Sequence, residues 1–192
     1  MTIGFALCGS FCTYSQVFPV MEALVEEYDV IPIFSDASSS IDSRFGNATD
    51  HIARAETICS RSAIATIAQA EPIGPKKLLD ALVIAPCTGN TLAKLSHSIA
   101  DTPVTMAAKS HLRNGRPVVV AVSTNDGLAG AAENIGRLLA RKHYYFVPFG
   151  QDDAAGKPTS LVADFAQIPQ TLDAALEGRQ IQPILISQCI GN

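Results

Sequence analysis

The chain is built from short apolar runs, each of which ends in a loop of Gly, Ser, Asn or Asp residues. Nearly continuous runs of Val, Ile, Leu and Ala are typical of parallel strands that are covered on both faces. This pattern predicts five strands, at residues 3–8, 30–34, 82–85, 118–122 and 144–147.

Between these strands, apolar residues recur at the spacing of a helix face. Helices are predicted at residues 15–28, 62–70, 89–99, 103–114 and 127–141. Alternating strands and helices predict an α/β fold: a three-layer sandwich with a Rossmann-like, mostly parallel sheet and helices on both faces. Because the sequence shows no internal repeat and no linker, residues 1–192 are expected to form a single domain.

The last part of the chain departs from this alternation. Residues 151–158 are polar and predict a loop, and residues 160–177 are amphipathic with an interruption at Pro169. Residues 183–187 fit either a short edge strand or an arm that reaches a neighbouring subunit.

Composition narrows the class of protein. With 47% hydrophobic and 17% charged residues, the chain is neither disordered nor fibrous. Its net charge of -4 argues against a nucleic-acid-binding surface, and no apolar run approaches the roughly 20 residues that span a membrane. The first residues run into a glycine turn with no basic segment before them, as expected for a buried strand rather than a secretion signal. The five scattered cysteines favour free thiols in a reducing cytoplasm.

The polar loops that follow the strands are the expected ligand sites, because open parallel sheets bind ligands at the carboxyl ends of their strands. The first loop offers Gly9, Ser10 and Thr13 before a helix. It matches neither the dinucleotide motif nor the nucleoside triphosphate loop. Its glycine, hydroxyls and helix N-terminus suit one terminal phosphate, although ordinary helix capping explains the same residues.

Three further loops repeat this composition. The second loop is rich in serine and includes Ser35 and Ser38, which fit either a solvated turn or the same phosphate. The third loop presents Thr88, Asn90 and Thr91 on a tight turn. The fourth contains Asn125 before a possible helix cap. No histidine lies in these loops and no metal-binding pattern occurs, so the residues alone predict a phosphate-bearing planar ligand, no metal and no identified catalytic base.

At residues 8–14, 85–94 and 101–109 the chain resembles the flavoprotein family of homo-oligomeric flavin-containing cysteine decarboxylases, with A-P-x-x-x-N-T-x-A-K as the more specific motif. The resemblance implies FMN bound between subunits of a trimer or a multiple of trimers. It implies that the phosphate lies on the first two loops and the flavin ring on the third. The implied cofactor-binding residues are Gly9, Ser10, Thr13, Ser35, Ser38, Thr88, Asn90 and Thr91.

Further motifs resemble a sporulation-linked branch of this family: C-T-Y at 12–14, S-R-F-G at 43–46, A-E-P-I-G-P-K at 70–76 and P-F-G-Q-D-D at 148–153. This branch implies an oxidoreductase subunit in the mother-cell cytoplasm of a spore-forming bacterium. There it acts with a dehydrogenase-like partner protein in the NADP-linked oxidation of a lysine-pathway intermediate to a planar pyridine dicarboxylate.

Two residues are the predicted catalytic positions. The guanidinium of Arg44 suits one carboxylate of a small dicarboxylate substrate, although a solvated loop arginine is the alternative. Asn125 matches the only shared position of the decarboxylases' P-x-M-N segment. The histidine that these decarboxylases use is absent from the S-R-F-G region. Two alternatives therefore stay open: a non-catalytic partner that has lost its flavin, and an FMN-dependent decarboxylase or prenyltransferase.

Overall fold

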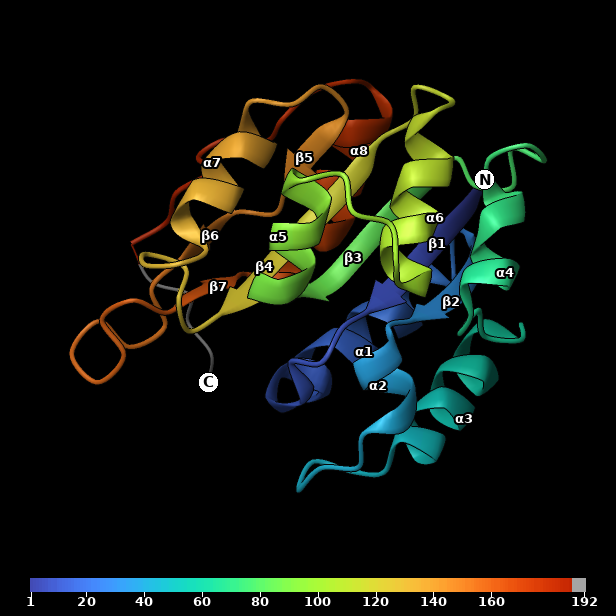
Figure 1. Cartoon of the computed structure of the whole chain (residues 1–192), viewed down its shortest axis with the longest axis horizontal. Coiled ribbons are helices and arrows are strands. Elements are labelled where there is room, and N and C mark those ends of the chain that lie inside the picture. Colours follow the sequence, from blue (N-terminus) through green and yellow to red (C-terminus); the bar gives the residue numbers. More distant parts are fainter. Residues whose placement is uncertain (188–192) are drawn as a thin grey trace.

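The computed structural model describes residues 1–187, and its centre is a sheet of seven strands (Figure 1). The strand order is β2-β1-β3-β4-β7-β6, with β5 paired to β4 outside this path. All five predicted strands are present as β1 to β5. The bounds are β1 Thr2–Leu7, β2 Asp29–Phe34, β3 Ala81–Cys87, β4 Val118–Thr124, β5 Tyr144–Phe146, β6 Phe149–Gly150 and β7 Leu161–Ala163.

The first five strands are parallel, and β1 lies between β2 and β3. One edge of β4 pairs with β3. The other edge is shared, because β5 pairs with its first half and β7 pairs antiparallel with its end, at Ser123 and Thr124. Every residue of β3 is buried, which explains why its sequence is almost wholly apolar.

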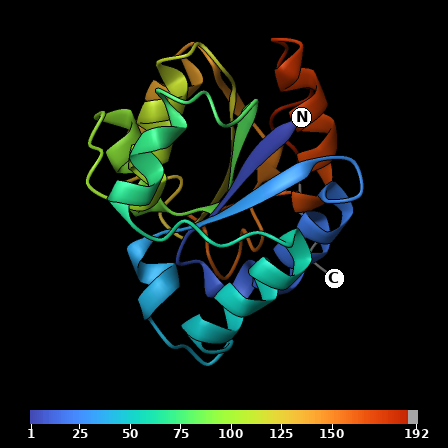
Figure 2. The same ribbon diagram turned by 90° about the vertical axis from the view of Figure 1, so that its right-hand side faces the viewer.

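Helices cover both faces of the sheet (Figure 2). Helices α1, α3 and α8 pack together on one face, and α4, α5, α6 and α7 on the other, so the predicted three-layer sandwich is confirmed. The bounds are α1 Tyr14–Leu24, α2 Asp36–Ser40, α3 Ala48–Cys59, α4 Ile67–Ala70, α5 Gly89–Ser96, α6 Pro103–Leu112, α7 Ala132–Leu139 and α8 Ile168–Leu176. Short 3-10 turns precede α1 (η1, Phe11–Thr13), follow α4 (η2, Glu71–Ile73) and precede α8 (η3, Phe165–Gln167). No helix among residues 1–187 has the length and apolar character needed to cross a membrane.

Several predicted boundaries were wrong. The helix predicted at 127–141 begins only at Ala132, because the backbone N–H groups of Ala129 and Ala131 both turn back to the carbonyl of Asp126. The amphipathic segment 160–177 divides into β7, η3 and α8. Helix α4 is shorter than predicted, since a capping box at Thr66 starts it late. Helices α2 and α3 were not predicted.

The tail at 183–187 lies along the edge of the sheet. Phe149 of β6 donates its N–H to the carbonyl of Ile184 and accepts from the N–H of Ile186, at 3.0 and 3.1 Å. The edge-strand alternative is therefore the one this chain adopts within its described part. Residues 188–192, including Cys189, lie outside the described residues. The other four cysteines are free thiols.

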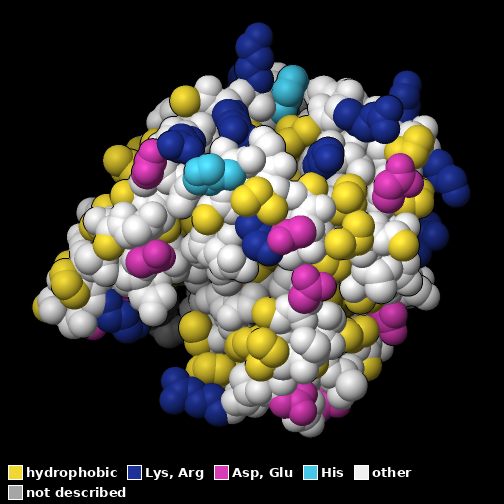
Figure 3. Space-filling model, in the orientation of Figure 1, with side chains coloured by type: hydrophobic (Ala, Val, Ile, Leu, Met, Phe, Trp, Pro, Cys, Tyr) yellow, Lys and Arg dark blue, Asp and Glu magenta, His cyan; other side chains and the backbone are white. Residues whose placement is uncertain are grey.

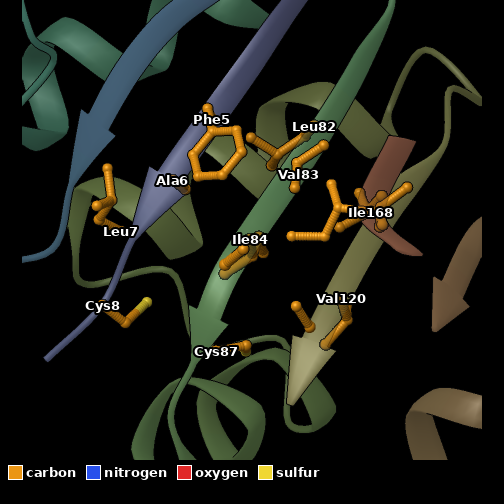
Figure 4. Packing of buried hydrophobic residues seen from close by; sticks show 14 of the residues in the cluster. Phe5, Ala6, Leu7, Cys8, Leu82, Val83, Ile84, Cys87, Val120 and Ile168 are labelled. Atoms are coloured by element: carbon orange, nitrogen blue, oxygen red, sulfur yellow. The ribbon is translucent and has the colours of Figure 1, made fainter. Parts of the chain in front are cut away.

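The core fills the space between the sheet and its helices. Figure 4 shows Phe5 of β1, Leu82 and Ile84 of β3, Val120 of β4 and Ile168 of α8 among the buried side chains of this core. All five side chains are fully buried. Burial of such side chains stabilises the fold by about 1.5–3 kcal/mol each, which fixes the strand ends that carry the polar loops.

Candidate functional site at the strand ends

The four polar loops meet at the carboxyl ends of β1 to β4. A side chain at Gly9 would place its Cβ 3.3 Å from the Cβ of Ala37, so the first and second loops touch. The hydroxyl of Ser10 lies 2.8 Å from that of Ser123, which joins the first loop to the end of β4. Because β1 is central, these contacts bring distant parts of the sequence to one end of the sheet.

The third loop packs against its neighbours on both sides. Thr91 donates a hydrogen bond to the Sγ of Cys8, 3.3 Å away at the end of β1. Gly89 lies so close to the fourth loop that a Cβ there would come within 2.7 Å of Thr124 Oγ1 and 2.9 Å of Asp126 Oδ1. A larger residue at this position would push these two side chains aside, so Gly89 lets the third and fourth loops approach closely.

The position of β1 also makes this end of the sheet the topological switch point. The chain first builds outward from β1 to β2, and then returns to place β3 on the other side of β1. The parallel order β2-β1-β3-β4-β5 is that of flavodoxin-like sheets, in which ligands bind at the β1/β3 crevice.

A cleft of about 480 Å³ opens beside this crevice. Ser10, Thr13 and Asn125 line it, which are three of the ten residues that the sequence singled out. Its opposite wall comes from residues 152–164, which were interpreted only as a loop and an amphipathic segment. Figure 3 shows the hollow between that loop, at the left, and the lower part of the molecule.

The charged side chains of the cleft are mostly carboxylates. Asp152, Asp153 and Asp164 line it together with one cation, Lys157. Lys157 Nζ lies 3.0 Å from Asp152 Oδ2, and this hydrogen bond raises the pKa of the ammonium group. The ion pair is exposed and easily exchanged for another partner. The cleft is therefore electronegative apart from one movable cation.

Comparison with known proteins assigns the family. The flavoprotein family model matches residues 1–151. The chain belongs to the flavoprotein family. It is 47% identical over 191 residues to the B subunit of dipicolinate synthase from Bacillus subtilis (strain 168), and the match covers 99% of this chain and 96% of that protein.

One solved structure resembles the chain in both sequence and fold, and a second resembles it in fold. The crystal structure of the B subunit of dipicolinate synthase from Bacillus halodurans C has a TM-score of 0.89 and 46% identity, covering 97% of this chain and 96% of that one. The FMN-dependent cysteine decarboxylase SpaF has a TM-score of 0.64 at 19% identity, covering 91% and 97%. The second likeness is one of fold alone.

The first and third loops leave helix N-termini without side-chain caps. Ser10, Thr13 and Thr88 occupy N-cap positions, yet none of their side chains makes a capping bond. Thr13 instead donates to the carbonyl of Ser10 at 2.8 Å. The backbone N–H groups of these first turns therefore have no capping side chain, and helix N-termini attract anions. A flavoprotein phosphate site needs donors of this kind.

The second loop is arranged differently. Ser35 caps α2 by accepting from the N–H of Ser38 at 3.2 Å. The hydroxyl of Ser38 is completely buried and donates to the carbonyl of Leu7 at 2.8 Å. The Ser38 hydroxyl thus holds the loop against β1, the Ser35 hydroxyl bonds within the loop, and neither residue lines the cleft. Within this chain the two serines fix the position of the second loop without facing the cleft.

The third loop sits beside the cleft rather than in its lining. Thr88 is half-buried, Thr91 is buried against Cys8, and Asn90 is exposed in the first turn of α5. Burial raises the pKa of the Cys8 thiol to about 11, so it is protonated at neutral pH and is not a nucleophile. Asn90 presents its amide to solvent.

Arg44 lies in a separate region. Its guanidinium stands 4.8 Å from the ring centroid of Phe45, on the exposed loop after α2. Phe45, His51 and Arg54 line a small cavity of about 150 Å³, and Cys12 borders both this cavity and the cleft. Arg44 lines neither. The structure therefore does not bring Arg44 to Asn125 within one chain.

His51 is the residue of that region that sequence reasoning missed. It lies in α3 against Tyr14 and Phe18, and burial lowers the pKa of its imidazole. Its Nε2 is buried without a hydrogen-bond partner among the described residues. The signal available in the sequence was weak, since α3 buries mainly small residues and was not predicted.

Proposed function

We propose that this chain is the B subunit of dipicolinate synthase. In this proposal it is an oxidoreductase component that acts with a separate A subunit in the mother-cell cytoplasm of a spore-forming bacterium. The reaction is the NADP-linked oxidation of a dihydrodipicolinate-type intermediate of the lysine pathway to dipicolinic acid. The observation that carries the proposal is the 47% identity to a protein of that name, which extends over 191 residues rather than over one motif.

FMN is the proposed cofactor, at the carboxyl ends of β1 and β3. Gly9 allows close approach, the N–H groups that follow Ser10 would hold the phosphate beside Thr13, and Ser35 and Ser38 would fix the neighbouring loop. Thr88, Asn90 and Thr91 would border the flavin ring. When bound, FMN supplies a hydride acceptor, whereas the nicotinamide is assigned to the dehydrogenase-like partner.

The chain's own polar residues would orient the small dicarboxylate substrate. Asn125 lines the cleft and offers an amide, with its backbone carbonyl held by Thr159 at 2.6 Å. Lys157 is the cation in the same lining and would exchange Asp152 for a substrate carboxylate. Arg44, exposed on another loop, would reach substrate only at a contact with another copy of the chain. A catalytic role for Arg44 therefore requires a homo-oligomer, proposed as a trimer or a multiple of trimers.

The test is an assay with and without the dehydrogenase-like partner, combined with an absorbance spectrum. We expect dipicolinate to form when the two proteins are mixed, and the purified chain to take up FMN with the visible bands of a bound flavin. Ser10→Ala is expected to weaken FMN uptake, whereas Ser15→Ala, an exposed serine on α1, serves as the matched control. Full activity from the dehydrogenase-like partner alone would remove the catalytic role of this chain.

One observation favours a second candidate. Three carboxylates stand in the cleft beside the hydroxyls that would meet a phosphate, and like charges repel. In this alternative the chain is a non-catalytic component that has lost flavin and stabilises its dehydrogenase-like partner. Absence of FMN uptake, together with a raised melting temperature of that partner in the mixture, would select it.

A further inference from the structure

A second large cavity lies at the opposite end of the sheet. It has a volume of about 380 Å³ and is enclosed by the end of α5 with the loop after it, by α6, and by the start of β5. Because β5 is parallel to its neighbours and Tyr144 is its first residue, this cavity is at the amino ends of the strands. It shares no lining residue with the strand-end cleft.

The floor of this cavity is apolar. Leu95 of α5, Leu112 of α6 and the ring of Tyr144 contribute to it, and Leu95 and Tyr144 are buried. Ile99, which is 48% exposed, stands at its side. Small-molecule sites combine such apolar walls with a few polar groups, in volumes of roughly 300–1,000 Å³.

The charged groups around this floor are all cationic. Lys109, Arg141 and Lys142 line the cavity together with His143, and no Asp or Glu among the described residues does so. Seven of the chain's 14 Lys and Arg residues lie within 4.0 Å of a carboxylate in the described residues, and three of the other seven meet here. Figure 3 shows several Lys and Arg side chains along the upper edge of the molecule.

Arg141 is held in place without being neutralised. Its Nη1 donates to the carbonyl of Leu95 at 3.0 Å and its Nη2 to the carbonyl of Ser96 at 2.6 Å. These acceptors are at the C-terminal end of α5, where a helix favours a cation. The guanidinium is thus fixed by neutral carbonyls, whereas Lys109 and Lys142 are exposed and free to close over a ligand.

We propose that this cavity binds a small organic anion, namely an apolar ring that carries a carboxylate, at a site separate from the strand-end cleft. The ring would lie on Leu95, Leu112 and Tyr144, and the carboxylate would face Lys109, Lys142 and Arg141. Such a ligand gains from burial of its ring and from attraction between its carboxylate and the cations. Partial desolvation on the apolar floor strengthens that attraction. The proposal does not depend on flavin binding.

The experiment follows the ¹⁹F NMR signal of 4-fluorobenzoate titrated with the full chain, and uses 4-fluorobenzamide as the neutral isostere. We expect the carboxylate to bind and the amide to bind about tenfold more weakly or not at all, since the neutral amide cannot form charge-assisted hydrogen bonds with the three cations. Added FMN is expected to leave the 4-fluorobenzoate signal unchanged.

Variants locate the site. Lys109→Glu and Lys142→Glu are each expected to weaken 4-fluorobenzoate binding about fivefold, as reversal of an exposed charge does. Lys77→Glu, an exposed lysine outside the cavity, is the charge-matched control and should have no effect. Ala100→Phe fills the cavity without changing charge and should abolish binding.

Four outcomes would overturn the proposal. Equal binding of the acid and the amide removes the role of charge. Equal losses in Lys109→Glu and Lys77→Glu reduce the effect to the overall charge of the chain. Unchanged binding in Ala100→Phe places the acid elsewhere, provided that circular dichroism shows the variant to be folded. Displacement of 4-fluorobenzoate on self-association, seen by sedimentation, would assign the cavity to a second copy instead.

Discussion

The two cavities at opposite ends of the sheet differ most in charge. The cleft at the carboxyl ends is lined by three aspartates and one lysine. The cavity at the amino ends is lined by three cations on an apolar floor, and no carboxylate among the described residues shares that lining. A net charge of -4 describes neither of them, so overall composition is a poor guide to what each end attracts.

This difference indicates two ways of handling an anion. At the cleft, backbone N–H groups and hydroxyls are the available donors, and they work over short distances in fixed positions. At the opposite cavity, lysine and arginine side chains act through charge, and exposed charges are screened by salt. Anion binding at the amino ends should therefore weaken with ionic strength more steeply than phosphate binding at the cleft.

A fall in pH is expected to have the largest effect on the free energy of unfolding. The residue responsible lies in α6, which borders the cavity at the amino ends of the strands. His111 of α6 is fully buried, and burial lowers the pKa of its imidazole to about 4. An unfolded histidine titrates near 6.5, so the unfolded chain binds the proton first. His111 therefore contributes about 3 kcal/mol of stability above pH 6.5 that is lost as the pH falls to 4.

Urea unfolding at pH 7 and at pH 4 measures this loss. His111→Gln retains an N–H donor toward the carbonyl of Pro117, which lies 3.0 Å from the imidazole, but cannot titrate. We expect the variant to have the flatter pH dependence. If its stability falls with pH as steeply as that of the native chain, His111 is not the group responsible.

A larger side chain placed behind the wall of the cleft should have the next largest effect on the free energy of unfolding. Gly127 is buried, and a Cβ there would come within 2.7 Å of Leu161 in β7. Gly127→Val is expected to cost about 2 kcal/mol through overpacking and to displace the wall of the cleft. Thermal unfolding measures the cost, and Gly136→Val is the control, because a Cβ added there would meet no other part of the described chain within 4 Å. A loss of 4-fluorobenzoate binding in folded Gly127→Val would show that the two ends are coupled.

Removal of the hydroxyl that joins β4 to the first loop should have a smaller effect. Ser123 is 5% exposed and its hydroxyl lies 2.8 Å from that of Ser10. Ser123→Ala is expected to cost about 1 kcal/mol, because Ser10 keeps access to water when its partner is removed. Denaturant unfolding of this variant beside Ser15→Ala gives the difference. Identical midpoints would mean that the bond contributes nothing.

Neutralising one carboxylate of the cleft should have the smallest effect. Asp153→Asn keeps an acceptor for the N–H of Gly156, now at 2.8 Å, and removes one negative charge. FMN titration at low salt is expected to give about twofold tighter binding, and the gain should vanish at about 1 M salt, where charges are screened beyond roughly 3 Å. A gain that persists in salt would point to a change of shape instead of charge.

Much of the fold was predictable because its strands are unusual in sequence. The five parallel strands are apolar almost throughout, and a run such as Leu82–Ala85 has few other interpretations. Helix α3 was missed because its buried face consists of Ala48, Ala55, Cys59 and His51, which give little contrast with the polar face. Strand β7 has three residues and is followed almost at once by η3, so its sequence was interpreted as part of one amphipathic segment.

The site was predictable only as far as strand order determines it. Loops after parallel strands meet at one end of a sheet, which placed Gly9 and Asn90 at the same end. The wall that carries Lys157 comes from β7 and the loop before it, and their antiparallel return to β4 leaves no mark in the sequence. The pairing of Ser38 with Leu7 likewise depends on a contact 31 residues apart.

The shared edge of β4 also decides which segment completes the cleft. Residues 1–147 contain all five parallel strands, whereas β7 finds its partner only at the far end of β4. A chain cut after β5 would keep every parallel strand and lose the wall of the cleft that residues 152–164 form. The parallel sheet and the cleft are therefore separable in sequence, although both belong to one fold.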